Sequence, residues 1–287
     1  MNNFKFKNIK TLISLISFSF ILLSGGQISN AQMEKGSILF VSPFRVTIET
    51  NEKVQLLNVS NKSDKTRRYS IEIVNQVMKP DGSTHRVENF EYSAKRMLRF
   101  VPKRFTLDSG ERQTLRVMAI RPKDLPDGDY HSHLLLREVP LQLQNVENLK
   151  TSKLSSGARF EIRALYGVGV PIVVENGNIH SSIEIETAEL KSDENKKTLS
   201  IKFNRSGNAE ASVMMETKLS QPGFADIDLV QKQWVRLYRE VENVEKNFDI
   251  QLPEGRNLKN GTIKISLIKD PNTNAKSVIV EKSITIK

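Results

Sequence analysis

The histidines of this sequence are the side chains best suited to metal chemistry. His131 and His133 are separated by one residue in a strand-like run, so both imidazoles could lie on one face and bind Zn²⁺. There is no cysteine to complete such a site, and no Asp or Glu joins the pair at a characteristic spacing. The sequence therefore predicts a solvent-exposed pair of strand histidines, with no metal site.

Motifs of the common enzyme classes are absent from the sequence. It contains no Gly-x-Ser-x-Gly elbow, no phosphate-binding loop and no Gly-x-Gly-x-x-Gly fingerprint. The fragment Gly167-Val-Gly169 lies in an apolar strand-like run rather than before a helix. The lack of cysteine excludes thiolate chemistry and disulfide bonds. The sequence thus predicts a protein that is not an enzyme and needs no cofactor.

Two arginines, Arg45 and Arg163, stand among apolar residues in strand-like runs. A buried guanidinium needs a partner, because an unpaired charge in an apolar environment costs free energy. Either side chain could lie at a strand edge, covering apolar surface with its stem and keeping its head in water. Alternatively, the two guanidinium groups could together bind a carboxylate through bidentate hydrogen bonds. Composition alone favours the strand-edge interpretation.

The N-terminus has the features of a secretory signal peptide. Lys5, Lys7 and Lys10 precede the apolar run 11–24, and a small-x-small pattern ends at Ala31. We expect cleavage after Ala31; an uncleaved anchor is the alternative. Cleavage of residues 1–31 would reduce the net charge from +10 to +7, because the segment carries three lysines and no acidic residue. The remaining charges are scattered, which argues against nucleic acid as a partner and is compatible with acidic clients or anionic headgroups.

The rest of the chain reads as short strands separated by turns. Alternating apolar residues recur from residue 38 to the end, and Pro43 interrupts the first run, 38–48. No long amphipathic helix is predicted. The polar stretch 141–158 reads as a long loop before the strand-like run 159–174. The pattern predicts an all-β fold of two antiparallel β-sandwich domains, at residues 36–174 and 178–287.

A series of short motifs runs in order through the first predicted domain. They are Ser42-Pro-Phe-Arg-Val46, Leu57-Asn-Val-Ser-Asn61, the run from Pro102 to Arg116, Leu125-Pro126, Leu136-Arg-Glu-Val-Pro140 and the run from Phe160 to Tyr166. Across residues 38–174 this series resembles the periplasmic pilus (fimbrial) assembly chaperones. The second domain matches only as a further sandwich of suitable size. The resemblance implies a subunit-binding cleft between two immunoglobulin-like domains.

The resemblance also implies how a subunit would be held. The last strand of the first domain would complete an unfinished pilus subunit by donor-strand complementation, and two basic residues would anchor the subunit's C-terminal carboxylate. By position, the anchors would be Arg45 and Arg163, the latter standing where the family usually has lysine. A period of two predicts that the donor side chains are Leu154, Ser156, Ala158, Phe160 and Ile162.

Two features depart from the family pattern. Ser156 and Ala158 are small where larger aliphatic residues are usual, which indicates another register or a client with shallow pockets. Gly167 replaces an arginine that often joins an interdomain salt bridge, although Asp129 could supply one acidic partner. The hinge between the domains would then be held differently from that of the family, as in an atypical branch of it.

The resemblance, together with the predicted signal peptide, implies a periplasmic, ATP-independent chaperone in fimbrium assembly and cell wall organization. Its partners would be pilus or fimbrial subunits and an outer-membrane usher, and after cleavage it would not be an integral membrane protein. The sequence leaves open whether the free protein forms a self-capping homodimer, in which each copy covers the exposed edge strands of the other. The alternative function is that of a secreted structural or adhesive two-sandwich protein that binds a surface partner through its edges.

Overall fold

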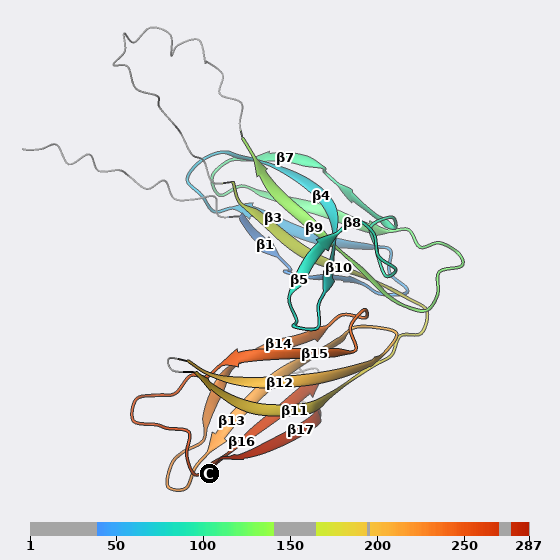
Figure 1. Cartoon of the computed structure of the whole chain (residues 1–287). Helices are drawn as coiled ribbons and strands as arrows, with labels where there is room; N and C mark the ends of the chain where they lie inside the picture. Colours follow the sequence, from blue (N-terminus) through green and yellow to red (C-terminus); the bar gives the residue numbers. More distant parts are fainter. Residues whose placement is uncertain (1–38, 141–164, 194–195, 270–276, 287) are drawn as a thin grey trace, which may run out of the picture. The chain divides into compact units, whose positions relative to one another are not determined.

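The computed structural model describes residues 39–140, 165–193, 196–269 and 277–286, in which every regular element is a β-strand (Figure 1). The strands are β1 (Leu39–Ser42), β2 (Val46–Ile48), β3 (Val54–Asn61), β4 (Arg67–Met78), β5 (Thr84–Val87), β6 (Leu98–Val101), β7 (Arg104–Leu107), β8 (Arg112–Ala119), β9 (Gly128–Val139), β10 (Gly167–Asn176), β11 (Ser181–Asp193), β12 (Lys196–Gly207), β13 (Ala211–Ser220), β14 (Ile227–Leu237), β15 (Asn243–Asp249), β16 (Gly261–Lys269) and β17 (Ser277–Ile286).

The strands from β1 to β10 form one sandwich of two sheets. One sheet has the order β1-β3-β8-β6, and the other has the order β2-β10-β9-β4-β5, with β7 also paired to β4. Alternation along the strands produces the core: on β8, Leu115 and Val117 are buried whereas Arg116 between them is exposed. Leu57, opposite Leu115 on the neighbouring strand β3, and Leu136, on β9 of the facing sheet, belong to the same apolar cluster.

The first predicted strand is interrupted where the sequence places Pro43. Before the interruption β1 pairs antiparallel with β3, and after it β2 pairs parallel with β10 in the other sheet. Residues 43–45 therefore carry the chain from one sheet to the other. This confirms the interrupted strand predicted for residues 38–48, and it places Arg45 at the crossing.

The strands from β11 to β17 form the second sandwich, coloured from yellow to red in Figure 1. Its sheets have the orders β11-β12-β15 and β14-β13-β16-β17. On β13 every second residue from Ala211 to Leu219 is buried. Phe203 and Met215 are among the largest fully buried side chains of this core. The prediction of an all-β fold with two immunoglobulin-like sandwiches is thus confirmed.

Residues 36–287 form one compact unit. Within it, the β4–β5 hairpin contacts the second sandwich. Met78 packs in the apolar cluster of the second sandwich, and the carbonyl of Pro80 accepts a hydrogen bond from the Glu245 N–H at 2.8 Å. The hairpin turns at Gly82, whose φ of +76° favours glycine, and the preceding Pro80-Asp81 suits such a turn. The exact boundary between the two predicted domains stays a prediction.

Several predicted features lie outside the described residues. They are the signal peptide 1–31, the anchor Arg163 and the donor residues Leu154, Ser156, Ala158, Phe160 and Ile162. Within the described ranges, no helix is long and apolar enough to cross a membrane.

Candidate functional site

Arg45 lies between β1 and β2, beside the edge of β10. Its neighbour Val46 is paired with Ile172, and this pairing continues to Val174. The Arg45 Nη2 atom lies 2.5 Å from Oε1 of Glu210, the residue just before β13. The two side chains keep 18% and 11% of their surface exposed. In this structure, then, the arginine predicted to bind a carboxylate does bind one, and that carboxylate belongs to the second sandwich.

The ion pair uses only part of the hydrogen-bonding capacity of its two members. Arg45 Nη1 and Glu210 Oε2 are buried, and neither has a hydrogen-bond partner in the described part of the chain. A guanidinium and a carboxylate can form two parallel hydrogen bonds, and such bidentate pairs are the stronger ones. The Arg45–Glu210 pair is therefore joined by one nitrogen–oxygen contact, where a bidentate pair would have two.

The surroundings of Glu210 oppose its negative charge. Burial raises the pKa of Glu210; the charge of Arg45 works against that rise, and the charge of Asp129 adds to it. Asp129 is itself buried, and this raises the pKa of its carboxyl group. Its Oδ2 accepts a hydrogen bond from the backbone N–H of Glu210 at 2.7 Å. Asp129 thus fixes the backbone of Glu210 while its charge disfavours ionisation of the Glu210 side chain.

Asp129 makes hydrogen bonds to two residues of the second half of the chain, Glu210 and Arg239. We expected Asp129 to be one acidic partner of an interdomain salt bridge. Its carboxylate accepts a hydrogen bond from the backbone N–H of Glu210 in the second sandwich, and its backbone carbonyl accepts one from Arg239 Nη1 at 3.3 Å.

The backbone at Gly167 is closely packed. An added Cβ there would lie 3.3 Å from the carbonyl oxygen of Leu136.

The two strand histidines are buried, and the prediction of a solvent-exposed pair is wrong. Only 1% of His131 and 6% of His133 is exposed. The His131 ring stacks on Tyr238 at a centroid distance of 4.1 Å, and its Nε2 lies 3.0 Å from Oε2 of Glu240. Tyr238 and Glu240 follow β14 and cover this face of β9. The local sequence around His131 contains no sign of this cover.

Burial changes the acid–base behaviour of this group of residues. It lowers the pKa of His133 to about 4, with further lowering by the charges of His131 and Arg45. For Glu240 burial acts to raise the pKa, but hydrogen bonds from His131 and from the Met78 N–H outweigh it and lower the pKa. Neutral His133 and ionised Glu240 are consequently favoured near neutral pH. No group of three or more His, Cys, Asp or Glu residues in the described ranges could hold a metal ion.

One edge of β10 is only partly covered. All of β10 pairs with β9 on one side, from Gly167 to Asn176. On the other side β2 pairs only with Ile172–Val174, and within the described ranges no strand pairs with Gly167–Pro171. Pro171 lacks an N–H donor and is best tolerated at such an edge. The open edge therefore ends where β2 begins, next to Arg45.

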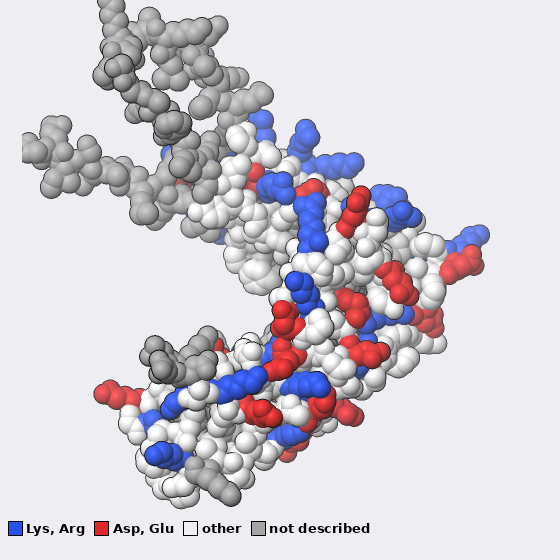
Figure 2. All heavy atoms as spheres, viewed as in Figure 1, with Lys and Arg blue, Asp and Glu red and all other residues white. Residues whose placement is uncertain are grey.

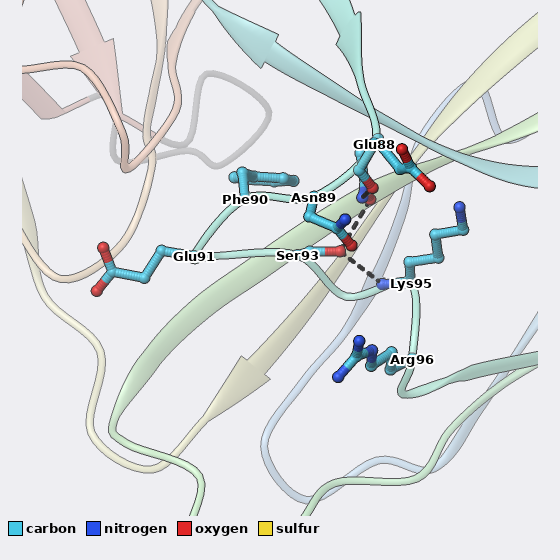
Figure 3. A pocket seen from close by; sticks show the side chains of 8 residues that line it. Glu88, Asn89, Phe90, Glu91, Ser93, Lys95 and Arg96 are labelled. Atoms are coloured by element: carbon cyan, nitrogen blue, oxygen red, sulfur yellow. Dashed lines mark hydrogen bonds between the residues drawn. The ribbon is translucent and has the colours of Figure 1, made fainter.

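A separate hollow of about 500 Å³ is lined by Asn75 of β4 and by residues of the segment 88–96 (Figure 3). The Asn75 side chain makes three hydrogen bonds at the wall of this hollow. Its Oδ1 accepts from the hydroxyl groups of Ser93 and Ser132, and its Nδ2 donates to the carbonyl of Glu88. Figure 3 shows the side chains of Lys95 and Glu91 extending in opposite directions. The side chains of Asn75 and Ser93 are therefore engaged in hydrogen bonds within the protein.

The charged residues on the molecular face shown in Figure 2 are of mixed sign. Blue Lys and Arg atoms alternate with red Asp and Glu atoms among neutral residues. This pattern agrees with the scattered charge expected from the sequence, and it does not indicate a polyanion-binding stripe on that face.

Comparisons with known proteins found structural neighbours only. No family model matches the chain, and no curated protein matches it. Among the similar solved structures is a chain of the chaperone–tip adhesin complex of CFA/I fimbriae biogenesis, with 13% identity and a TM-score of 0.44 over 87% of this chain and 98% of that one. Another is from the CsuC–CsuE chaperone–tip adhesion subunit pre-assembly complex of the archaic chaperone-usher Csu pili of Acinetobacter baumannii, with 15% identity, a TM-score of 0.43 and the same coverage. A third is the YadV chaperone, with 11% identity and a TM-score of 0.45 over 86% of this chain and 99% of that one. The fold assignment rests on the strand order and the two cores described above.

Proposed function

We propose that this chain is a periplasmic chaperone that binds, folds and caps pilus or fimbrial subunits without ATP and without catalysis. The observation that carries the proposal is one edge of β10: among the described residues only Ile172–Val174 pair there, and the unpaired stretch Gly167–Pro171 ends beside Arg45. An open strand edge offers unpaired backbone groups to which an extended segment can add. A carboxylate at the end of such a segment would meet the guanidinium.

The proposed site continues into the segment that precedes β10. Arg163 stands four residues before Gly167 and would be the second anchor. Leu154, Ala158, Phe160 and Ile162 would be the donor side chains. On β10 the even-numbered residues Val170, Ile172 and Val174 are buried in the core. The donor residues share this parity, which supports a strand that continues the apolar face of the sandwich toward a bound subunit.

The other parts of the proposal follow from the expected route of the chain. A signal peptide at residues 1–31 would direct export to the periplasm, and residues 36–174 and 178–287 would be the two chaperone domains. An outer-membrane usher would receive the loaded complex. In the absence of a subunit, a second copy of the chain could cover the same open edge as a homodimer.

A pull-down tests the proposal. The tagged full chain is expressed in the periplasm of a pilus-producing cell, and co-purifying proteins are quantified. We expect a small β-rich subunit in a one-to-one ratio and its loss from Arg45→Ala. Arg116→Ala, which removes an exposed arginine of β8, is the matched control and should retain the subunit.

Two results would contradict the proposal. If no subunit co-purifies with the wild-type chain, the chaperone function is wrong and the adhesive two-sandwich alternative gains support. If Arg45→Ala captures as much subunit as Arg116→Ala, the anchor assignment is wrong. Thermal unfolding of each variant verifies that the fold is retained, and the Arg45→Ala/Glu210→Gln double variant removes the carboxylate that the single change leaves unpaired.

A further inference from the structure

We infer that Glu210 is an internal substitute for the client carboxylate, holding Arg45 in the free protein and giving it up when a carboxylate-terminated strand binds. This inference rests on the proposed function, because it concerns the same anchor. The new element is competition: Glu210 of the second sandwich and the carboxylate of the client would compete for Arg45. The second sandwich would thereby control how readily the first one binds a client.

The contact has the properties expected of a replaceable partner. Glu210 meets Arg45 through one nitrogen and one oxygen at 2.5 Å, while the second nitrogen and the second oxygen have no partner among the described residues. A client carboxylate placed at the end of the β10 edge could engage the guanidinium with both oxygens. The exposed 18% of the Arg45 side chain gives an approach from solvent.

Glu210 is also poorly stabilised as an anion where it lies. Its side chain is nearly buried, and the neighbouring charge of Asp129 repels it; the charges of Arg45 and Arg236 favour the anion, but the pKa of Glu210 is still raised overall. Arg45 is its only ion-pair partner within 4.0 Å in the described ranges. Release of the side chain would relieve the repulsion from Asp129. The backbone can remain in place, because the Glu210 N–H is held by Asp129 Oδ2 independently of the side chain.

A purely structural role would give the opposite expectation. If the Arg45–Glu210 pair only fastened the two sandwiches together, removing its charge would leave carboxylate binding unchanged or weaker. If Glu210 competes with the client, removing its charge strengthens carboxylate binding, because the apparent affinity rises with the fraction of protein in the competent state. The sign of the change therefore separates the two roles.

The experiment uses two fluorescein-labelled dodecapeptides of alternating valine and serine that differ only at the C-terminus, one a free carboxylate and the other a carboxamide. Fluorescence anisotropy gives their affinities for the full-length wild type and for Glu210→Gln. We expect Glu210→Gln to bind the carboxylate peptide roughly tenfold more tightly, the factor that corresponds to losing a competing contact of about 1.4 kcal/mol, with the carboxamide unchanged. Glu216→Gln, on β13, removes a half-buried carboxylate that is paired with Lys232; it is the control and should match the wild type.

The outcomes distinguish this inference from the proposed function. A carboxylate preference that Arg45→Gln abolishes but Glu210→Gln does not increase overturns the competitor role and leaves the anchor intact. Absence of binding, or of any carboxylate preference, in both the wild type and Glu210→Gln refutes Arg45 as the anchor, and the competitor role with it.

Discussion

Replacing His133 by glutamine tests how strongly burial on β9 prevents protonation of the His133 imidazole. His133 is 6% exposed, and its pKa is lowered from 6.5 to about 4. Between these two values the unfolded chain binds a proton that the folded chain does not. The stability contributed by neutral His133 is therefore complete above pH 6.5 and is lost as the pH falls toward 4.

The magnitude follows from the shift. A difference of about 2.5 pKa units, at about 1.36 kcal/mol per unit, gives roughly 3.4 kcal/mol over the whole window. Between pH 7 and pH 5 the loss is about 2 kcal/mol by the same relation. Asp129 and Glu210, whose pKa values are raised by burial, act in the opposite direction. A comparison of wild type with His133→Gln isolates the histidine, because both proteins contain these carboxyl groups.

Urea denaturation at pH 7 and pH 5 provides the measurement. We expect the wild type to lose about 2 kcal/mol more of its free energy of unfolding than His133→Gln does over this interval. His85→Gln, at an exposed position on β5, serves as the control and should behave as the wild type does. Equal losses in the wild type and His133→Gln would show that the folded protein protonates His133 as readily as the unfolded chain does, and would refute the reasoning.

Three further predictions concern stability, each measured as a free energy of unfolding in urea. Glu138→Leu should cost about 3–5 kcal/mol, because it leaves the buried Arg67, now 2.9 Å from Glu138, without its partner; changing Arg67→Met as well should recover most of the loss. Arg205→Met should cost at least about 3 kcal/mol, because four hydrogen bonds from its guanidinium to backbone carbonyls disappear. Phe203→Ala should cost about 3–5 kcal/mol, whereas Phe224→Ala, at a site 59% exposed, should cost less than about 1 kcal/mol.

Each of these predictions has a contrary outcome. A double variant of Arg67 and Glu138 as unstable as Glu138→Leu alone would mean that packing, rather than the unpaired charge, dominates. A loss below about 1 kcal/mol for Arg205→Met would show that water replaces its carbonyl partners without cost. Similar losses for Phe203→Ala and Phe224→Ala would contradict the burial assigned to Phe203.

Local patterns in the sequence predicted the strands well. Val54–Asn61, Arg104–Leu107 and Ser277–Ile286 form strands within the region where the sequence alternates. The interruption at Pro43 was also predictable, because proline cannot donate to a ladder. These features depend on neighbours within a few residues, so a single sequence contains the information for them.

The contacts between the two sandwiches around Arg45 and His131 could not be predicted in the same way. Arg45 was identified as a carboxylate-binding residue, but its partner Glu210 comes from a turn that has no distinguishing pattern. The burial of His131 depends on Tyr238 and Glu240, which lie more than a hundred positions away along the chain. Alternation predicts which face of β9 His131 occupies, but not that another sandwich covers that face.

The parallel pairing of β2 with β10 has a consequence for the order in which the protein can fold during synthesis. Val46 and its partner Ile172 are separated by 126 positions (172 − 46), and a ribosome delivers Val46 first. Hairpins such as β4–β5 can form as soon as they emerge, whereas β2 must wait for almost the entire first sandwich to be made. Arg45 and the open edge beside it thus acquire their geometry together, in one late closing step. A nascent chain shorter than this would have neither the paired β2 nor the open edge of β10 beside Arg45.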